Sequence, residues 1–116
     1  MGKPVVHWKI GGNDTKMLQD FYSKLFDWKI DSNNLMNYGL ANTGGEGGIN
    51  GGIGPTGEDK KPYVTFYVQV DDLQGYLNRA EKLGGKVVIP PTEIPNVVTF
   101  ALFTDPEGDR IGLVKG

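Results

Sequence analysis

The residue best suited to chemistry in this chain of 116 residues is its single histidine, His7. An imidazole transfers protons near neutral pH and is a common metal ligand. Lys9 follows two positions later, and Tyr63, Thr65 and Tyr67 repeat that spacing in a second segment. Residues two apart in a β-strand point to the same face of the sheet. These side chains are therefore expected to line a shared surface that can bind a ligand.

Two segments are similar to ion-binding or phosphate-binding loops in composition only. Asp105–Asp109 alternates carboxylates but lacks the ligand spacing of a calcium-binding EF-hand, and its Pro and Gly predict a hairpin turn. Residues 44–54 hold seven of the 18 glycines. They lack the Lys-Ser/Thr ending of a phosphate-binding loop. A flexible hairpin or a close approach of backbones explains these glycines better.

The chain repeats itself with an offset of 58 residues. An internal repeat usually fixes the architecture of a protein. Four pairs of segments keep this register: Val6–Ile10 with Val64–Val68, Asn13–Asp14 with Asp71–Asp72, Leu25–Ile30 with Leu83–Val88, and Ile53–Gly54 with Ile111–Gly112. Each half is therefore expected to fold in the same way.

Each half begins with an alternating strand and continues with a helical pattern. Apolar residues then recur at spacings of three and four, which favours one apolar helix face. Asn13 and Asp71 stand where the N-caps of these helices are expected. Shorter strands are predicted over residues 28–31, 36–41, 48–54, 86–89, 97–104 and 110–115. The order within each half is β-α-β-β-β.

The fold class is therefore α+β, with one domain over residues 1–116. The first module spans residues 1–55, a polar linker spans 55–61, and the second module spans 62–116. The helices need an apolar sheet face to cover, and alternation assigns Val6, Trp8, Ile10, Val64, Phe66 and Val68 to that face. The opposite face, which carries His7 and Lys9, is left for a cavity or a partner.

These modules resemble the vicinal-oxygen-chelate superfamily of glyoxalases, bleomycin-resistance proteins and extradiol dioxygenases. The resemblance rests on Val64–Leu73, Leu83–Gly85 and Phe103–Asp109 in this order and spacing. It implies two β-α-β-β-β modules that form a curved mixed sheet around a cup, with the helices outside. It also implies a homodimer, because relatives often dimerise.

The resemblance also implies where a metal ion would bind in this chain. Metal-using relatives supply one ligand from the first and the last strand of each module. These positions here are His7, Thr65, about Gly54, and Gly112. A transition metal needs three or four converging donors, and glycines offer none. We therefore expect neither a metal nor another cofactor, although loop carboxylates could join His7 in a non-standard metal site.

Three functions remain open at this point. The first is a metal-free cup that binds a small aromatic or polar organic molecule, as in bleomycin-resistance proteins. The second is a lyase or isomerase of the glyoxalase type with an altered site, and the third is an interaction module whose cup its own side chains fill. The expected ligand-binding residues are His7, Lys9, Tyr38, Tyr63, Thr65, Tyr67 and Phe100. Aromatic walls with few polar groups are usual in ligand pockets.

Composition excludes several classes of partner. The chain has 12 basic and 14 acidic residues and a net charge of -2, without the basic stripe that nucleic-acid binding requires. No apolar run approaches the roughly 20 residues of a membrane span. Cysteine is absent, which fits a reducing compartment. We expect a cytoplasmic protein that binds neither nucleic acid nor membranes.

Overall fold

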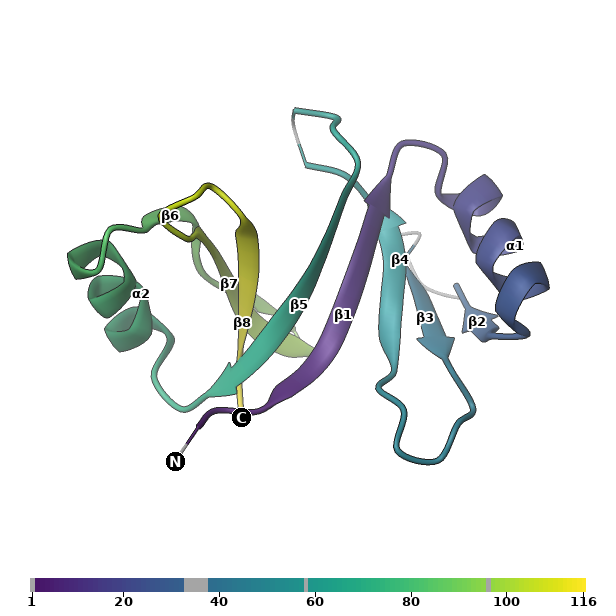
Figure 1. Cartoon of the computed structure of the whole chain (residues 1–116), viewed down its shortest axis with the longest axis horizontal. Helices are drawn as coiled ribbons and strands as arrows, with labels where there is room; N and C mark the ends of the chain where they lie inside the picture. The colour runs from purple at the N-terminus through teal and green to yellow at the C-terminus, as the bar shows by residue number, and fades with distance from the viewer. Residues whose placement is uncertain (1, 33–37, 58, 96) are drawn as a thin grey trace. The chain divides into compact units, whose positions relative to one another are not determined.

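The computed structural model describes residues 2–32, 38–57, 59–95 and 97–116 (Figure 1). Its elements follow the order β-α-β-β-β twice, so the predicted α+β class and the predicted element order are confirmed. They are β1 (Val5–Gly12), α1 (Thr15–Phe26), β2 (Lys29–Asp31), β3 (Gly39–Asn42), β4 (Gly51–Pro55), β5 (Tyr63–Val70), α2 (Leu73–Lys82), β6 (Lys86–Ile94), β7 (Val98–Thr104) and β8 (Arg110–Lys115).

The chain divides into two compact units. Residues 7–65 form one, here called the His7 unit, and residues 1–6 with 66–116 form the other, here called the Tyr67 unit. The expected linker, residues 55–61, belongs to the His7 unit. There the Asn13 amide donates a hydrogen bond of 2.9 Å to the Lys60 carbonyl and accepts one of 2.9 Å from the Thr56 hydroxyl.

The sheet of the His7 unit has the strand order β2-β3-β4-β1. β1 and β4 are parallel, whereas β2, β3 and β4 pair antiparallel. Helix α1 packs on one side, where the buried Gln19 amide donates a hydrogen bond of 2.9 Å to the Ile53 carbonyl of β4. Because Gly12 of β1 lies against Leu18 of α1, the residues that alternate with Gly12, among them His7 and Lys9, face the opposite side.

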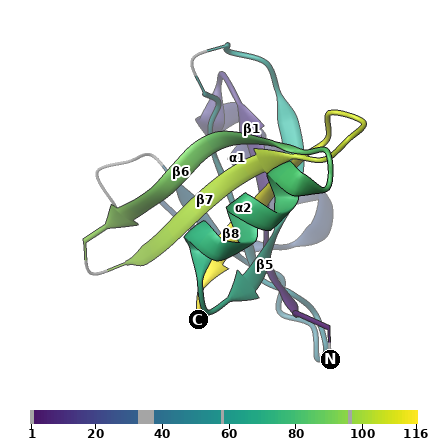
Figure 2. The same cartoon turned by 90° about the vertical axis from the view of Figure 1, so that its left-hand side faces the viewer.

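The Tyr67 unit repeats this arrangement with the strand order β5-β8-β7-β6. β5 and β8 are parallel, and α2 lies across the strands (Figure 2). Its buried core consists of Val70, Leu73, Leu77, Ala101 and Leu113. Leucine and valine side chains from both the helix and the strands therefore exclude water between them.

The predicted N-caps are wrong by one residue in both helices. Asp14, and not Asn13, accepts a hydrogen bond from the Met17 backbone N–H at 3.1 Å. Asp72, and not Asp71, accepts one from the Gly75 N–H at 3.1 Å. A cap must reach the backbone two or three residues ahead, and each helix begins one residue later than the sequence indicated.

The hairpin turn predicted at Asp105–Asp109 is confirmed. The Asp105 carboxylate accepts hydrogen bonds of 2.9 Å from the backbone N–H groups of Glu107 and Asp109. Gly108 has a φ of 95°, which residues other than glycine rarely adopt.

The predicted strands match β2, β3, β4, β6, β7 and β8 apart from shifted ends, and β6 runs five residues further than expected. Residues 36 and 37 of the third predicted strand lie outside the described residues.

The prediction that the helices cover the whole apolar face of the sheet is wrong in both units. Val6, Val64 and Phe66 are 38%, 73% and 41% exposed. In β5 only the far end, with Val68 and Val70, packs in the α2 core. The strand extends beyond the ten-residue helix, and the alternation of side chains cannot reveal where that cover ends.

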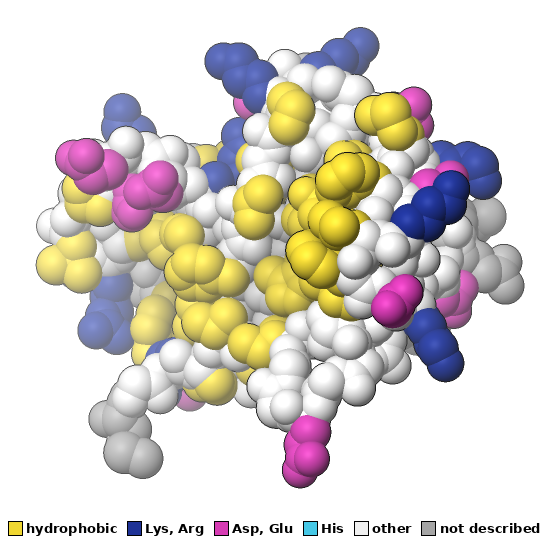
Figure 3. Space-filling view, turned by 45° about the vertical axis from the view of Figure 1, so that its right-hand side comes forward, with side chains coloured by type: hydrophobic (Ala, Val, Ile, Leu, Met, Phe, Trp, Pro, Cys, Tyr) yellow, Lys and Arg dark blue, Asp and Glu magenta, His cyan; other side chains and the backbone are white. Residues whose placement is uncertain are grey.

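Helix α1 also leaves apolar side chains in solvent. Met17, Phe21 and Leu25 are more than half exposed, whereas Gln19 is buried toward the sheet. Figure 3, which brings the α1 side of the molecule forward, shows hydrophobic side chains clustered at the surface. Among the described residues, no helix is both long and apolar enough to span a membrane.

These exposures predict that two large apolar side chains of the Tyr67 unit contribute very differently to stability. Leu77→Ala should lower the free energy of unfolding by about 2–5 kcal/mol, because it leaves a cavity in the α2 core. Phe66→Ala should cost far less, because its ring already contacts solvent. Urea denaturation followed by circular dichroism measures both values. Equal losses would show that Phe66 is buried in solution.

Candidate functional site

His7 and Tyr38 form the closest polar pair of the site. His7 lies in β1, and Tyr38 directly precedes β3. The His7 Nε2 and Tyr38 Oη atoms are 2.7 Å apart, and the two rings stack with centroids at 6.2 Å and an interplanar angle of 19°. A neutral imidazole can accept this proton from the hydroxyl or donate its own, according to its tautomer. The pair therefore has the elements of a proton-transfer relay.

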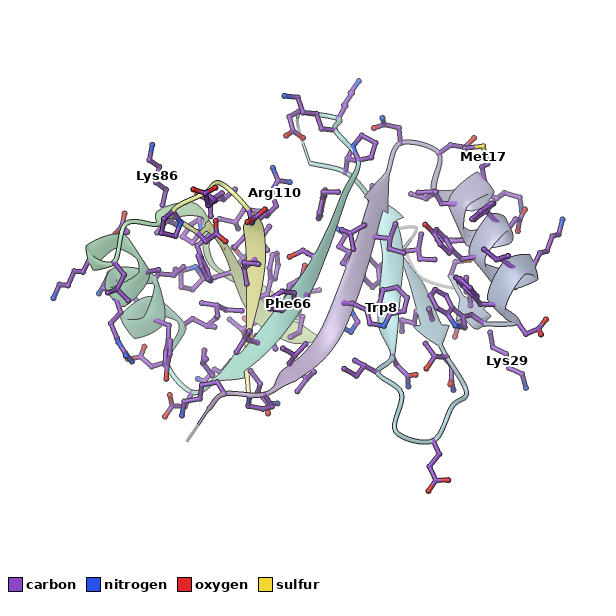
Figure 4. The ribbon with its side chains drawn as sticks, viewed as in Figure 1. Trp8, Met17, Lys29, Phe66, Lys86 and Arg110 are labelled. Carbon is purple, nitrogen blue, oxygen red and sulfur yellow. The ribbon has the colours of Figure 1, made fainter. Side chains whose placement is uncertain are left out.

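Two glycines of β4 hold the Tyr38 ring against the sheet. A Cβ atom added at Gly52 would lie 2.1 Å from Tyr38 Cζ, and one at Gly54 would lie 2.6 Å from Cδ1. Carbon atoms do not approach so closely. Any side chain at either position would consequently displace the tyrosine ring. Trp8 covers Gly51 on the other side of β4 in the same way, and Figure 4 shows it beside that strand.

Lys9 lies between two tyrosine rings. Its Nζ atom is 5.8 Å from the Tyr38 ring centroid and 5.2 Å from that of Tyr63. The Tyr63 ring rests on Gly11, where an added Cβ would lie 2.6 Å from Cε1. Lys9, Tyr38 and Tyr63 are all half-buried. A cation within about 6 Å of an aromatic face is attracted by the ring quadrupole.

The pKa of His7 is lowered below its ordinary value of 6.5. Burial is the main cause, because it penalises the charged imidazolium, and the positive charge of Lys9 is the second. His7 is therefore neutral at neutral pH. Lys9 then provides the positive charge beside the two tyrosine rings.

A shallow hollow of about 520 Å³ adjoins His7. It is lined by His7, Lys29, Ile30, Asp31, Leu40, Ala41, Asn42, Asn50 and Gly51, all within the His7 unit. Of these nine residues, only His7 was predicted from the sequence to bind a ligand. Strand pairing brings the others together from β2, β3, β4 and Asn50, which directly precedes β4. Nothing in their local pattern marks them.

The seven predicted ligand-binding residues are divided between the units. His7, Lys9, Tyr38 and Tyr63 come together in the His7 unit, which also contains Thr65. Thr65 is buried, with only 4% of its surface exposed. Two of the seven, Tyr67 and Phe100, belong to the Tyr67 unit.

Tyr67 repeats in its own unit the arrangement of tyrosine on glycine. It is only 8% exposed, and an added Cβ at its partner Gly112 would lie 2.3 Å from Tyr67 Cδ2. Phe100 is half-buried on β7, where it pairs with Val114 of β8. The Tyr67 ring therefore covers part of the sheet that the sequence analysis expected to be open.

The strand register corrects which glycines correspond in the two units. Lys9 of β1 pairs with Gly52 of β4, and Tyr67 of β5 pairs with Gly112 of β8. Lys9 and Tyr67 correspond in the 58-residue repeat, so the counterpart of Gly112 is Gly52 and not the expected Gly54. The last strand is shifted by two residues, which keeps the same face of the sheet but moves the position along it.

The described residues do not fit a metal ion of the kind that relatives bind. Gly52, Gly54 and Gly112 have no side-chain donor atoms, and tyrosine rings occupy the space where a carboxylate side chain would begin. Among the described residues, no three His, Cys, Asp or Glu side chains group closely enough to hold a metal. His7 already pairs with Tyr38. This donor set does not meet the three or four ligands that zinc or iron requires.

Sequence comparison assigns the family. The profile of the Glyoxalase/Bleomycin resistance protein/Dioxygenase superfamily matches residues 5–113. The chain belongs to this superfamily. This agrees with the resemblance derived from the motifs and with the duplicated β-α-β-β-β order.

Three individual proteins are similar to this chain at less than 30% identity. The protein named "Putative glyoxylase CFP32" from Mycobacterium bovis is 29% identical over 106 residues, which cover 86% of this chain and 41% of that protein. The chain thus spans about two fifths of that relative's length. A superfamily member from Vibrio splendidus has a TM-score of 0.64 at 13% identity, covering 99% of this chain and 100% of its own. The Mycobacterium tuberculosis methylmalonyl-CoA epimerase has a TM-score of 0.66 at 16% identity, with coverages of 96% and 86%. At these identities the structures establish the fold alone.

The electrostatics of His7 predict its titration. The imidazole should titrate below 6.5, and Lys9→Gln should raise the midpoint only partway toward 6.5, because burial is the larger cause. His7 should make its full contribution to the free energy of unfolding above pH 6.5. This contribution should fall as the pH drops from 6.5 toward the folded-state pKa, since the unfolded chain binds the proton more readily. NMR of the imidazole protons measures the midpoint, with Lys24→Gln on α1 as the control. A midpoint at or above 6.5 would contradict this account.

Proposed function

We propose that this chain binds a small organic molecule, without a metal ion, on the face of the His7 unit that carries His7 and Lys9. The observation that carries the proposal is the cover of Gly52, Gly54 and Gly112 by tyrosine rings. Aromatic surface thus lies at strand positions where the family resemblance implies metal ligands. The resemblance to bleomycin-resistance proteins implies binding of this kind. The ligand would contact Tyr38 and Tyr63, with Lys9 and His7 as polar partners.

A second candidate is an enzyme of the lyase or isomerase type that works without the usual metal. The hydrogen bond between His7 and Tyr38 favours this candidate. A neutral imidazole can remove a proton from a substrate, and the tyrosine hydroxyl can return one. Turnover of a carbonyl substrate that His7→Gln and Tyr38→Phe both abolish would establish the enzyme over the binding protein.

The third function from the sequence analysis is an interaction module whose face is closed by its own side chains. The burial of Tyr67 on Gly112 favours it for the Tyr67 unit. Lys9, Tyr38 and Tyr63 are half-buried and so partly open to solvent, which favours ligand binding for the His7 unit.

We also propose that residues 1–116 act as one domain in the cytoplasm, in keeping with the absence of cysteine.

A homodimer would cover the exposed apolar side chains of α1. Met17, Phe21 and Leu25 recur at four-residue intervals and form a stripe along the helix. Exposed apolar patches of this kind commonly mark contacts between proteins. We propose that a second copy of the chain packs against this stripe.

Ligand binding without metal has a direct test by two-dimensional NMR. Planar aromatic compounds should shift the backbone resonances of β1 and β4, whereas Ni, Zn, Co and Mn should neither bind stoichiometrically nor raise the melting temperature. A metal bound only to the native state at 100 times its dissociation constant would add about 2.7 kcal/mol of stability, which a melting curve detects easily. An ion held by His7 and two or more carboxylates would disprove the proposal.

The dimer is tested by light scattering coupled to size-exclusion chromatography. The wild-type chain should elute with twice the mass of one chain. Phe21→Glu should give the monomer mass, because it places a charge in the apolar stripe. Lys16→Glu on the same helix should remain dimeric, since Lys16 is exposed and lies about 140° around the helix from Phe21. A wild-type monomer at all concentrations would refute the dimer.

A further inference from the structure

Lys9 is a cation whose contacts with the described residues are aromatic rings. Its contacts are the rings of Tyr38 and Tyr63, at 5.8 Å and 5.2 Å from Nζ. Within the part of the chain that the structure describes, no carboxylate forms an ion pair with it. A half-buried ammonium loses part of its hydration, and the aromatic faces replace only some of it. An added anion would restore the missing interaction.

Two described groups that could affect this positive charge, Asp31 and His7, leave it in place. Asp31 is the carboxylate that lines the neighbouring hollow. The register Lys9 to Gly52, Gly52 to Leu40 and Leu40 to Asp31 separates it from Lys9 by two intervening strands. Three strand spacings are about 14 Å, which exceeds a Debye length at physiological ionic strength. His7 is neutral at neutral pH, because burial and Lys9 both lower its pKa.

We propose that Lys9 binds the carboxylate of a planar organic anion whose body lies against the rings of Tyr38 and Tyr63. This inference rests on the proposed function and names the ligand class. One ammonium neutralises one carboxylate, whereas a phosphate dianion calls for further positive donors. The tyrosine rings offer apolar surface to the body of the ligand. The glycines at positions 11, 52 and 54 allow those rings to lie directly on the strands.

The test compares benzoate with benzamide, which have the same shape but differ in charge. NMR titration of the whole chain measures both dissociation constants. Benzoate should bind more tightly than benzamide, and Lys9→Gln should weaken benzoate by about tenfold or more, the usual value of a hydrogen bond to a charged group. Lys9→Arg should retain most of the affinity. Lys24→Gln on α1 is the matched control and should leave benzoate binding unchanged.

Other results of these titrations would lead to different conclusions. Equal binding of benzoate and benzamide, or equal weakening of both by Lys9→Gln, would overturn the assignment of Lys9 while leaving small-molecule binding intact. Competition by inorganic phosphate at the same concentration as benzoate would replace the carboxylate with a general anion site and overturn the inference. Failure of both aromatic compounds to bind would overturn the proposed function and this inference with it.

Discussion

The candidate site depends on the packing of tyrosine rings directly on glycine backbone. Tyr38 lies on Gly52 and Gly54, Tyr63 lies on Gly11, and in the other unit Tyr67 lies on Gly112. A ring can approach a strand this closely only where the strand has no Cβ atom. The same contact therefore fixes the ring position, fills the place of a side chain and removes the donor atoms that a metal ion would need.

The electrostatics of the His7 unit follow from this packing. The Tyr38 hydroxyl is held within 2.7 Å of His7 Nε2 because its ring cannot move into the strand. Burial keeps the imidazole neutral, and Lys9 adds to that effect. The result is a neutral histidine–tyrosine pair next to one ammonium group. Such a site favours hydrogen bonding and anion binding over the coordination of a cation.

The superfamily shows how one fold supports different chemistry through a few strand positions. In this chain Gly52 and Gly112 occupy such positions on the last strands of the two units, and the fold is unchanged. The β-α-β-β-β order, the parallel pairing of the first and last strands, and the aspartate caps are the same in both units. Function must therefore be inferred from the side chains on the strand faces and not from the architecture.

The sequence alone determined the duplicated α+β architecture, the Asp105–Asp109 turn and the face on which His7 and Lys9 lie. Each of these depends on local periodicity or turn chemistry, which neighbouring residues encode. Only the tertiary structure decided that Tyr38 contacts His7, that Gly52 and not Gly54 corresponds to Gly112, and that Phe66 and Val64 are exposed. These features depend on strand register and on how far a helix extends over a sheet. Both are set by contacts between residues distant in the chain, so side-chain alternation cannot reveal them.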